Sequence, residues 1–245
     1  MAENTFTPLH ASLDERTRRY YLDVMGIQCW ELVQGNADSA QQSEETGTAL
    51  QQLETDIQQC TKCQLHASRK QAIAGRGNPS AELMFVLLSP DMNDDESGQL
   101  CSGEANTLFT KMLSAINISI DDVFITSLLK CGVPAQHTVS TTELHYCKDY
   151  LKQQVQLIQP KLLVILGETA ARCMLQQNAS LDDLRALINT ELNSNITSDT
   201  ATISKLFESV PLFASYSPQE LIHKPENKRN AWLDLQQLQK ILETW

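Results

Sequence analysis

The sequence contains no apolar run that approaches the roughly 20 residues needed to span a bilayer. Its first ten residues include neither a basic segment nor an apolar stretch, so no secretory signal is visible. We therefore expect a cytoplasmic protein without membrane contact, in a compartment where thiols stay reduced. Hydrophobic residues still make up 42% of the 245 residues, which is enough for a substantial core.

Positive charge is also scarce, because 19 Lys and Arg residues stand against 30 Asp and Glu residues, and the formal net charge is −11. Tight binding to a DNA backbone requires clustered Lys and Arg side chains that neutralise phosphates. The balance therefore disfavours an autonomous DNA-damage binding module with salt-dependent affinity, although it allows a local basic groove. We expect any DNA contact to be weak or indirect.

Cysteine is comparatively abundant, and four of the seven cysteines have a spacing that is typical of metal ligands. Cys60 and Cys63 form a C-x-x-C pair, and Cys131 and Cys147 follow with fifteen residues between them. Four thiolates can hold zinc or an iron–sulfur cluster, and spacing alone does not choose between them. The alternative is that Cys131 and Cys147 are small buried hydrophobic residues. The cysteines without such partners are expected in the core or on the surface: Cys29, Cys101 and Cys173.

Three zones follow one another along the chain. Residues 1–35 read as an N-terminal docking arm with a short helix and a Trp-containing segment. Residues 36–48 are polar and read as a linker. Residues 49–245 alternate apolar runs with helical patterns and read as one globular domain.

That alternation predicts a three-layer α/β/α fold around a central, mainly parallel four-stranded sheet, with ligand sites at the carboxyl ends of the strands. The expected strands lie at residues 83–88, 123–126, 162–166 and 210–214. Helices are expected at about residues 105–117, from Ser140, after Gly167, at about residues 181–192 and from about Glu226. Ser140 and Glu143 form a capping-box pattern at the start of the second of these helices.

The residues around the cysteines resemble the family-4 uracil-DNA glycosylases over roughly residues 50–242. The matching motifs include Cys60-Thr-Lys-Cys63, Gly75-x-Gly77, the segment from Phe124 to Cys131, Glu143-x-x-x-Cys147, Leu166-Gly167-x-x-Ala170 and Ser215-Tyr-Ser-Pro218. The resemblance implies a uracil-DNA glycosylase-like domain with a [4Fe-4S] cluster of structural role, zinc being the less favoured occupant. The implied cluster ligands are Cys60, Cys63, Cys131 and Cys147.

Four positions depart from that family's pattern. The family carries an acid where this chain has Leu88, and a Phe that stacks on uracil where it has Cys101. Ser127 replaces an Asn that reads the base edge, and Ser217 replaces a His that stabilises the leaving base. A flipped base is read by stacking and edge hydrogen bonds, and loss of one transition-state donor costs on the order of 3 kcal/mol. We therefore expect a degenerate glycosylase domain with no catalytic residue.

The N-terminal arm carries a second resemblance. A capping-box pattern at Ser12 predicts a short helix that ends at Gly26. The pattern beyond Ser12 resembles the N-terminal segment of the psi subunit of bacterial DNA polymerase III, which docks onto the clamp-loader core. The residues expected to bind a partner are Arg18, Tyr20, Leu22, Met25, Gly26, Ile27, Trp30 and Leu32. The alternative is that the arm folds back on its own domain.

Together the two resemblances predict a non-catalytic, psi-like accessory subunit whose arm binds the clamp-loader core. They also imply the chi subunit as a partner and, through it, single-strand-binding protein. The alternative is an enzyme, a divergent family-4-like uracil-DNA glycosylase that acts in DNA repair. In that reading a nearby carboxylate such as Asp91 or Asp94 substitutes for the missing acid. Otherwise the acidic run that also contains Asp95 and Glu96 is expected to be a solvated loop.

Overall fold

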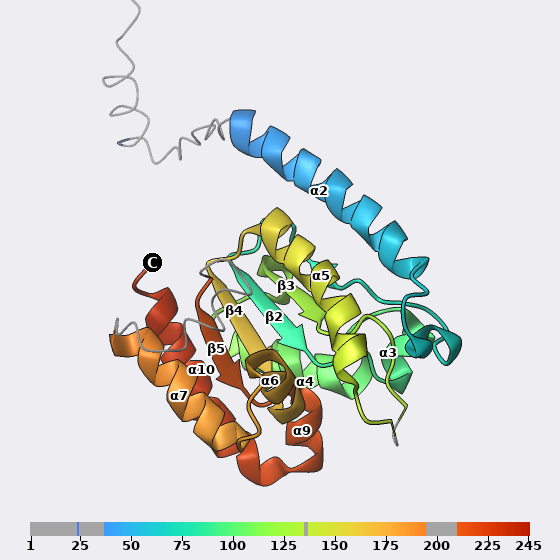
Figure 1. The fold of residues 1–245 in the computed structure, drawn as a ribbon. Helices are drawn as coiled ribbons and strands as arrows, with labels where there is room; N and C mark the ends of the chain where they lie inside the picture. Colours follow the sequence, from blue (N-terminus) through green and yellow to red (C-terminus); the bar gives the residue numbers. More distant parts are fainter. Residues whose placement is uncertain (1–23, 25–36, 135–136, 195–209) are drawn as a thin grey trace, which may run out of the picture. The chain divides into compact units, whose positions relative to one another are not determined.

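The computed structural model describes residue 24 and residues 37–134, 137–194 and 210–245 (Figure 1). The docking arm expected at residues 1–35 lies outside the described residues, apart from Val24. The same holds for all eight expected partner-binding residues: Arg18, Tyr20, Leu22, Met25, Gly26, Ile27, Trp30 and Leu32. By its contacts the chain divides into residues 1–40 and 41–245, and the second unit contains the sheet described below.

A five-stranded sheet forms the centre of the described part of the chain, in the order β1-β3-β2-β4-β5 (Figure 1). The strands are β1 (Arg76–Gly77), β2 (Leu83–Leu87), β3 (Val123–Ser127), β4 (Leu162–Leu166) and β5 (Leu212–Ser215). Every neighbouring pair is parallel except β1 with β3. Helices flank the sheet, so the expected three-layer α/β/α fold is confirmed, and the four expected strands are present.

The additional strand, β1, is too short and too polar to give a hydrophobic run. It depends on Gly77, which has a φ of 124°. A Cβ atom at this position would lie 2.1 Å from the carbonyl oxygen of Val123. Only glycine therefore lets β1 approach β3 this closely.

The helices connect the strands and flank both faces. They are α2 (Ala37–Gln58), α3 (Met92–Ser97), α4 (Gly103–Ser114), α5 (Thr141–Ile158), α6 (Glu168–Leu175), α7 (Leu181–Ser194), α9 (Pro218–His223) and α10 (Lys228–Leu242). The capping box between Ser140 and Glu143 is formed at the start of α5. Among the described residues, no helix combines the length and apolarity needed to cross a membrane.

Helix α2 occupies most of the segment that the sequence analysis reads as a polar linker at residues 36–48. Six of these thirteen residues are Ala, Gln or Glu, which have high helix propensity even without an apolar stripe. In the second half of α2, Leu53 and Ile57 are buried and anchor the helix. The segment is therefore a helix that continues into the domain.

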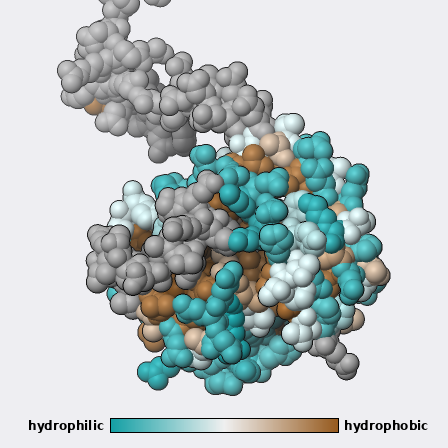
Figure 2. All heavy atoms as spheres, viewed as in Figure 1, coloured by the Kyte–Doolittle hydropathy of each residue, from teal (hydrophilic) through white to brown (hydrophobic). Residues whose placement is uncertain are grey.

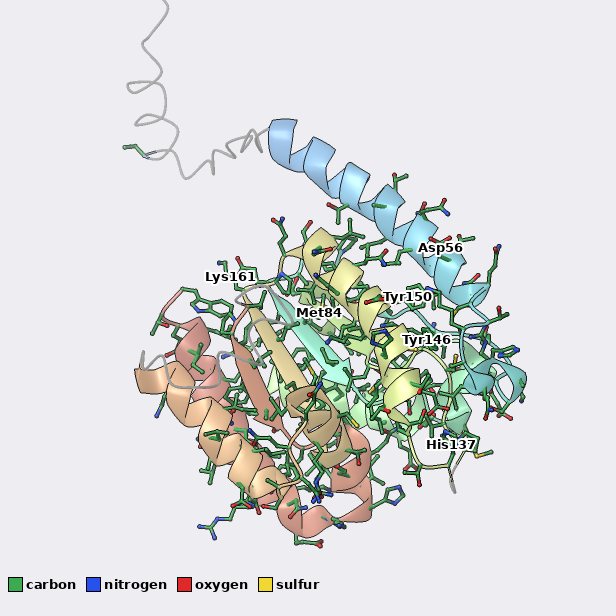
Figure 3. All side chains as sticks on the ribbon, in the orientation of Figure 1. Asp56, Met84, His137, Tyr146, Tyr150 and Lys161 are labelled. Carbon is green, nitrogen blue, oxygen red and sulfur yellow. The ribbon has the colours of Figure 1, made fainter. Side chains whose placement is uncertain are left out.

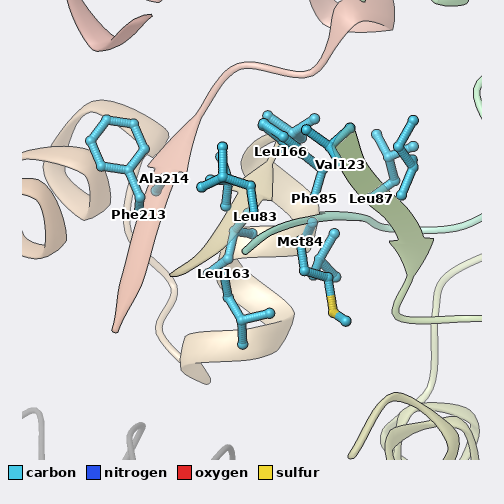
Figure 4. Close-up of a cluster of buried hydrophobic side chains, with 14 of the residues drawn as sticks. Leu83, Met84, Phe85, Leu87, Val123, Leu163, Leu166, Phe213 and Ala214 are labelled. Carbon is cyan, nitrogen blue, oxygen red and sulfur yellow. The ribbon is translucent and has the colours of Figure 1, made fainter. Parts of the chain in front are cut away.

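Two apolar clusters hold the domain together. The larger one surrounds the sheet, where β2, β3 and β4 are buried at every position (Figure 4). Phe85 and Phe109 meet there edge to face, with ring centroids 5.0 Å apart. The smaller cluster joins Leu53 and Ile57 to the cysteine region. The face seen in Figure 2 is mostly hydrophilic, with apolar atoms between the polar groups.

A buried ion pair links α7 to α10 beside the end of β5. Arg185 Nε donates to Asp234 Oδ2 at 2.8 Å, and Ser215 Oγ donates to the same oxygen at 2.7 Å.

We expect Asp234→Ala to lower the free energy of unfolding by about 3 kcal/mol, because it leaves the Arg185 guanidinium without its buried partner. Chemical denaturation measures this change. Glu96→Ala, which breaks the exposed pair with Lys70, is the matched control and should cost less than about 1 kcal/mol.

Candidate functional site

A cavity of about 400 Å³ opens at the edge of the sheet where the parallel strands end. Its walls come from the end of β2 and the loop after it, from the β4–α6 junction, and from α9. Ligand sites in open α/β sheets occupy this position, because the connections diverge beyond the carboxyl ends of the strands. The position agrees with the site expected from the sequence.

Asp91 is one of the two carboxylates in the cavity wall. It is the N-cap of α3, and its Oδ1 accepts the backbone N–H of Asp94 at 2.7 Å. Its other oxygen, Oδ2, accepts a hydrogen bond from Gln219 Nε2 of α9 at 2.5 Å. Two elements that are far apart in the sequence thus fix the orientation of this side chain. The second carboxylate, on Glu220, is held by the backbone N–H groups of Glu168 and Ser217.

Basic side chains complete the cavity wall. His223 lies in the last turn of α9, and Lys224 follows it. The sequence analysis did not single out Gln219, His223 or Lys224. One sequence signal could have indicated these three residues. The Ser217-Pro218 pair starts a helix directly after a buried strand, so the residues that follow lie near the carboxyl ends of the strands.

The structure brings only two of the four departing positions into this cavity. Leu88 and Ser217 line it, and Ser217 also caps α9 by accepting the N–H of Glu220. Ser127 pairs with Leu87 of the neighbouring strand but is fully buried. Cys101 is buried beside α4 and does not line the cavity.

The acidic run is ordered, contrary to the solvated loop that the sequence suggested. It forms α3, and Asp94 is 1% exposed. The Asp94 carboxylate accepts the backbone N–H groups of Cys101 and Ser102 at 2.9 and 2.7 Å. Cys101 has a φ of 56°, and burial and the Asp94 carboxylate raise the pKa of its thiol to about 12. Asp94 therefore stabilises the turn before α4, and Asp91 is the acid of this run that reaches the cavity.

The end of β3 contains two buried hydroxyl groups, of which one is hydrogen-bonded and the other is not. Ser127 Oγ has no partner among the described residues, whereas Thr126 Oγ1 bonds to the Ala74 carbonyl, the Gln154 amide and Lys130 Nζ. We expect Ser127→Ala to leave the free energy of unfolding unchanged within about 0.5 kcal/mol. Thr126→Val, the matched change, should lower it by about 1–3 kcal/mol because it leaves buried polar partners unsatisfied. Equal losses in urea denaturation would contradict this assignment.

The four cysteines implied as ligands come from three separate segments. Cys60 and Cys63 lie between α2 and the 3-10 turn at Gln64–Ala67. Cys131 follows β3, and Cys147 lies in the second turn of α5. All four belong to the smaller apolar cluster. Tyr150 covers this region from the α5 side that faces α2, with Lys62 Nζ 4.7 Å above its ring (Figure 3).

The pKa values of these thiols depend on one another. Burial raises the pKa of Cys147 to about 11, the N–H of Lys130 opposes that shift, and the thiolates of Cys131 and Cys63 add to it. Burial likewise raises the pKa of Cys131, Arg69 lowers it, and Cys63 and Cys60 raise it. Four clustered thiols with no carboxylate among them form a soft donor set, which suits zinc or an iron–sulfur cluster. Among the described residues, no three His, Cys, Asp or Glu side chains have the geometry of a single-ion site.

Comparison with known proteins identifies relatives for most of the chain. The chain is 30% identical to a type-4 uracil-DNA glycosylase of Archaeoglobus fulgidus over 178 residues, which is 73% of this chain and 85% of the relative. It is 27% identical to the type-4 enzyme of Sulfurisphaera tokodaii, covering 80% of this chain and 86% of the relative. The type-4 enzyme of Pyrobaculum aerophilum is 35% identical over 127 residues, covering 52% and 65%.

These relatives overturn part of the sequence analysis. The expectation of a non-catalytic clamp-loader subunit is wrong, because the relatives are named as glycosylases and none as a polymerase subunit. The expected loader core, chi and single-strand-binding protein partners are withdrawn with it. The expectation that DNA contact is weak or indirect also fails, since the relatives' names make DNA their substrate. The resemblance of the arm covers only some 16 residues and is weaker evidence for function than the match over 178 residues.

The family assignment depends on that domain. A family model described as the uracil DNA glycosylase superfamily matches residues 74–236. This range includes all five strands, the cavity and two of the four clustered cysteines. The chain therefore belongs to the uracil DNA glycosylase superfamily.

Proposed function

We propose that this protein is a divergent type-4-like uracil-DNA glycosylase, which hydrolyses the bond between uracil and deoxyribose in DNA. The observation that carries the proposal is the cavity at the strand ends, with Asp91 held in its wall, in a chain of this family. An enzyme of this kind must take the base out of the helical stack before it can act on it. A cavity of about 400 Å³ is large enough for a single base.

Asp91 is the residue proposed to activate water. Its carboxylate accepts the proton of a water molecule whose oxygen attacks C1′ of the deoxyribose, while the bond from C1′ to N1 of uracil breaks. The hydrogen bond from Gln219 orients the carboxylate, and the N–H of Asp94 keeps it in place. Positioned general bases contribute roughly 10²–10⁴-fold to a rate.

The departing uracil carries the electron pair of the broken bond. Donors in the cavity wall stabilise this developing negative charge, and His223 and Lys224 are the described side chains placed to supply them. In this proposal Asp91 and His223 take the roles that the family's motifs assign to the positions now held by Leu88 and Ser217. Two departures from the family's motifs have no replacement in this proposal: Cys101 stands in place of the Phe that stacks on uracil, and Ser127 in place of the Asn that reads the base edge.

We also propose that Cys60, Cys63, Cys131 and Cys147 hold a [4Fe-4S] cluster. The thiols are clustered and buried or half-buried, and they come from segments before β1, after β3 and within α5. A shared cluster would tie these segments together, which supports a structural role. The chain's own chemistry at Asp91 does not involve this site.

Uracil release from DNA tests the proposed function. The full-length protein is produced in cells that lack other uracil-DNA glycosylases and incubated with a single-stranded oligonucleotide that contains one uracil. We expect an abasic site, seen as strand cleavage after alkali, and no cleavage of the same oligonucleotide with thymine. No uracil release from either single-stranded or duplex DNA, by a protein with full cluster content, would refute the proposal.

A further inference from the structure

Two basic residues lie at the cysteine site, and within the described residues neither is neutralised by a carboxylate. Arg69 donates to a cysteine sulfur there, Lys130 directly precedes Cys131, and neither forms an ion pair with Asp or Glu within the described residues. In a chain with a formal net charge of −11, carboxylates are the more abundant charged group. No described carboxylate therefore balances the charge of these two side chains, although carboxylates are abundant in the chain.

Arg69 touches the sulfur of a proposed ligand directly. Its Nη1 donates to Cys131 Sγ at 2.8 Å. Its Nη2 donates to the carbonyl oxygens of Gln58 and Cys60 at 2.9 and 2.8 Å. The guanidinium is thus fixed by the backbone that carries the C-x-x-C pair and is aimed at the sulfur from the opposite segment.

Lys130 provides the second cation and is 1% exposed. Its Nζ donates to four neutral oxygens: Thr126 Oγ1 at 2.7 Å, Gln154 Oε1 at 2.7 Å, the Ser127 carbonyl at 2.8 Å and the Ala74 carbonyl at 3.3 Å. In the chain it directly precedes Cys131. A buried ammonium with only neutral acceptors is costly unless an anion lies nearby.

The contrast with Arg185 shows what this chain does elsewhere. Arg185 is also largely buried, and it pairs with both Asp182 and Asp234. Within the part of the chain that the structure describes, Arg69 and Lys130 have no such pair. A metal cluster held by four thiolates carries a net negative charge and would supply the missing counter-charge for both.

We propose that Arg69 and Lys130 are the counter-charges of the cysteine-bound cluster and set its reduction potential. This inference rests on the cluster proposed above. Hydrogen bonds to ligand sulfurs and nearby positive charge both favour the more negative, reduced cluster, so these residues raise the potential. They are positioning residues, since they act through the ligands and not on DNA.

The test compares Arg69→Gln and Lys130→Met with the unaltered full-length protein, all purified without oxygen. Midpoint potentials are measured by titration with dithionite, followed by the visible absorption of the cluster and by its electron paramagnetic resonance signal. We expect both substitutions to lower the potential and to weaken iron retention against a chelator by about 10-fold or more. Arg69→Lys, which keeps the charge, should recover part of the shift.

Matched controls separate charge from folding. Arg76→Gln removes another Arg that donates to backbone carbonyls, those of Leu100 and Cys101, and touches none of the proposed ligands. Lys161→Met removes a lysine that pairs with Glu82 on the other end of the sheet. Both should leave the potential unchanged.

Three results would overturn the inference. One is an unaltered potential and iron retention in both Arg69→Gln and Lys130→Met. Another is an equal shift in the controls. The third is an unaltered protein that holds zinc or no metal. The first two results do not bear on uracil release, which is measured by an assay of its own.

Discussion

Replacing Asp91 by Asn is expected to lower kcat for uracil release by about 10³-fold, because the amide cannot take the proton of the attacking water. The fold should be retained, since Asn is as good an N-cap as Asp for α3. The change should fall on kcat with little effect on KM, because the carboxylate acts on water and not on the bound base. Single-turnover measurement with excess protein separates this chemical step from product release.

Glu96→Gln is the matched control for Asp91→Asn. Glu96 belongs to the same helix and carries the same charge, but it is exposed and paired with Lys70 outside the cavity. Its replacement should leave uracil release within about twofold of the unaltered protein, as expected for a surface change away from the site. A rate for Asp91→Asn that equals the rate for Glu96→Gln would remove Asp91 from the mechanism.

Replacing Cys147 by Ser is expected to abolish cluster binding and to destabilise the domain by several kcal/mol, on the order of the folding energy that a structural metal site supplies. The loss should be large because a cluster would join the segment of Cys60 and Cys63 to α5, beyond the small apolar cluster and the hydrogen bond from Arg69 to the Cys60 carbonyl. Iron content, visible absorption and thermal unfolding measure the effect.

Cys173→Ser provides the comparison, since Cys173 lies on α6 and does not belong to the apolar cluster of the four cysteines. It should keep full iron content and an unfolding temperature close to that of the unaltered protein. Full iron content in Cys147→Ser would show that the cysteine assignment is incorrect.

Much of the fold could be predicted from local sequence. The strands β2 and β4 are five-residue apolar runs, a pattern typical of strands buried on both faces of a sheet. The capping box at Ser140 marks the start of α5. By contrast, β1 contains only Arg76 and Gly77, and its pairing depends on a close backbone approach that leaves no pattern. The helical character of residues 37–48 was missed because propensity without an apolar stripe resembles a linker.

The candidate site was predictable only in part. Cysteine spacing indicated a metal site, because Cys60 and Cys63 stand only three positions apart and leave a local signature. The cavity had no such signature, since Asp91 at the start of α3 and Gln219 in α9 are 128 positions apart in the sequence. Its acid was also hidden among four neighbouring carboxylates, and only burial and hydrogen bonding distinguish Asp91 from Asp94.

The central claim is that this cavity hydrolyses the glycosidic bond of uracil in DNA. The most direct measurement quantifies free uracil and abasic sites together, in one single-turnover reaction of the cluster-loaded protein with uracil-containing single-stranded DNA. We predict one uracil and one abasic site for each substrate strand consumed, at a rate that falls about 10³-fold in Asp91→Asn. Uracil that stays in the DNA throughout, with the protein folded and fully loaded, would contradict the account.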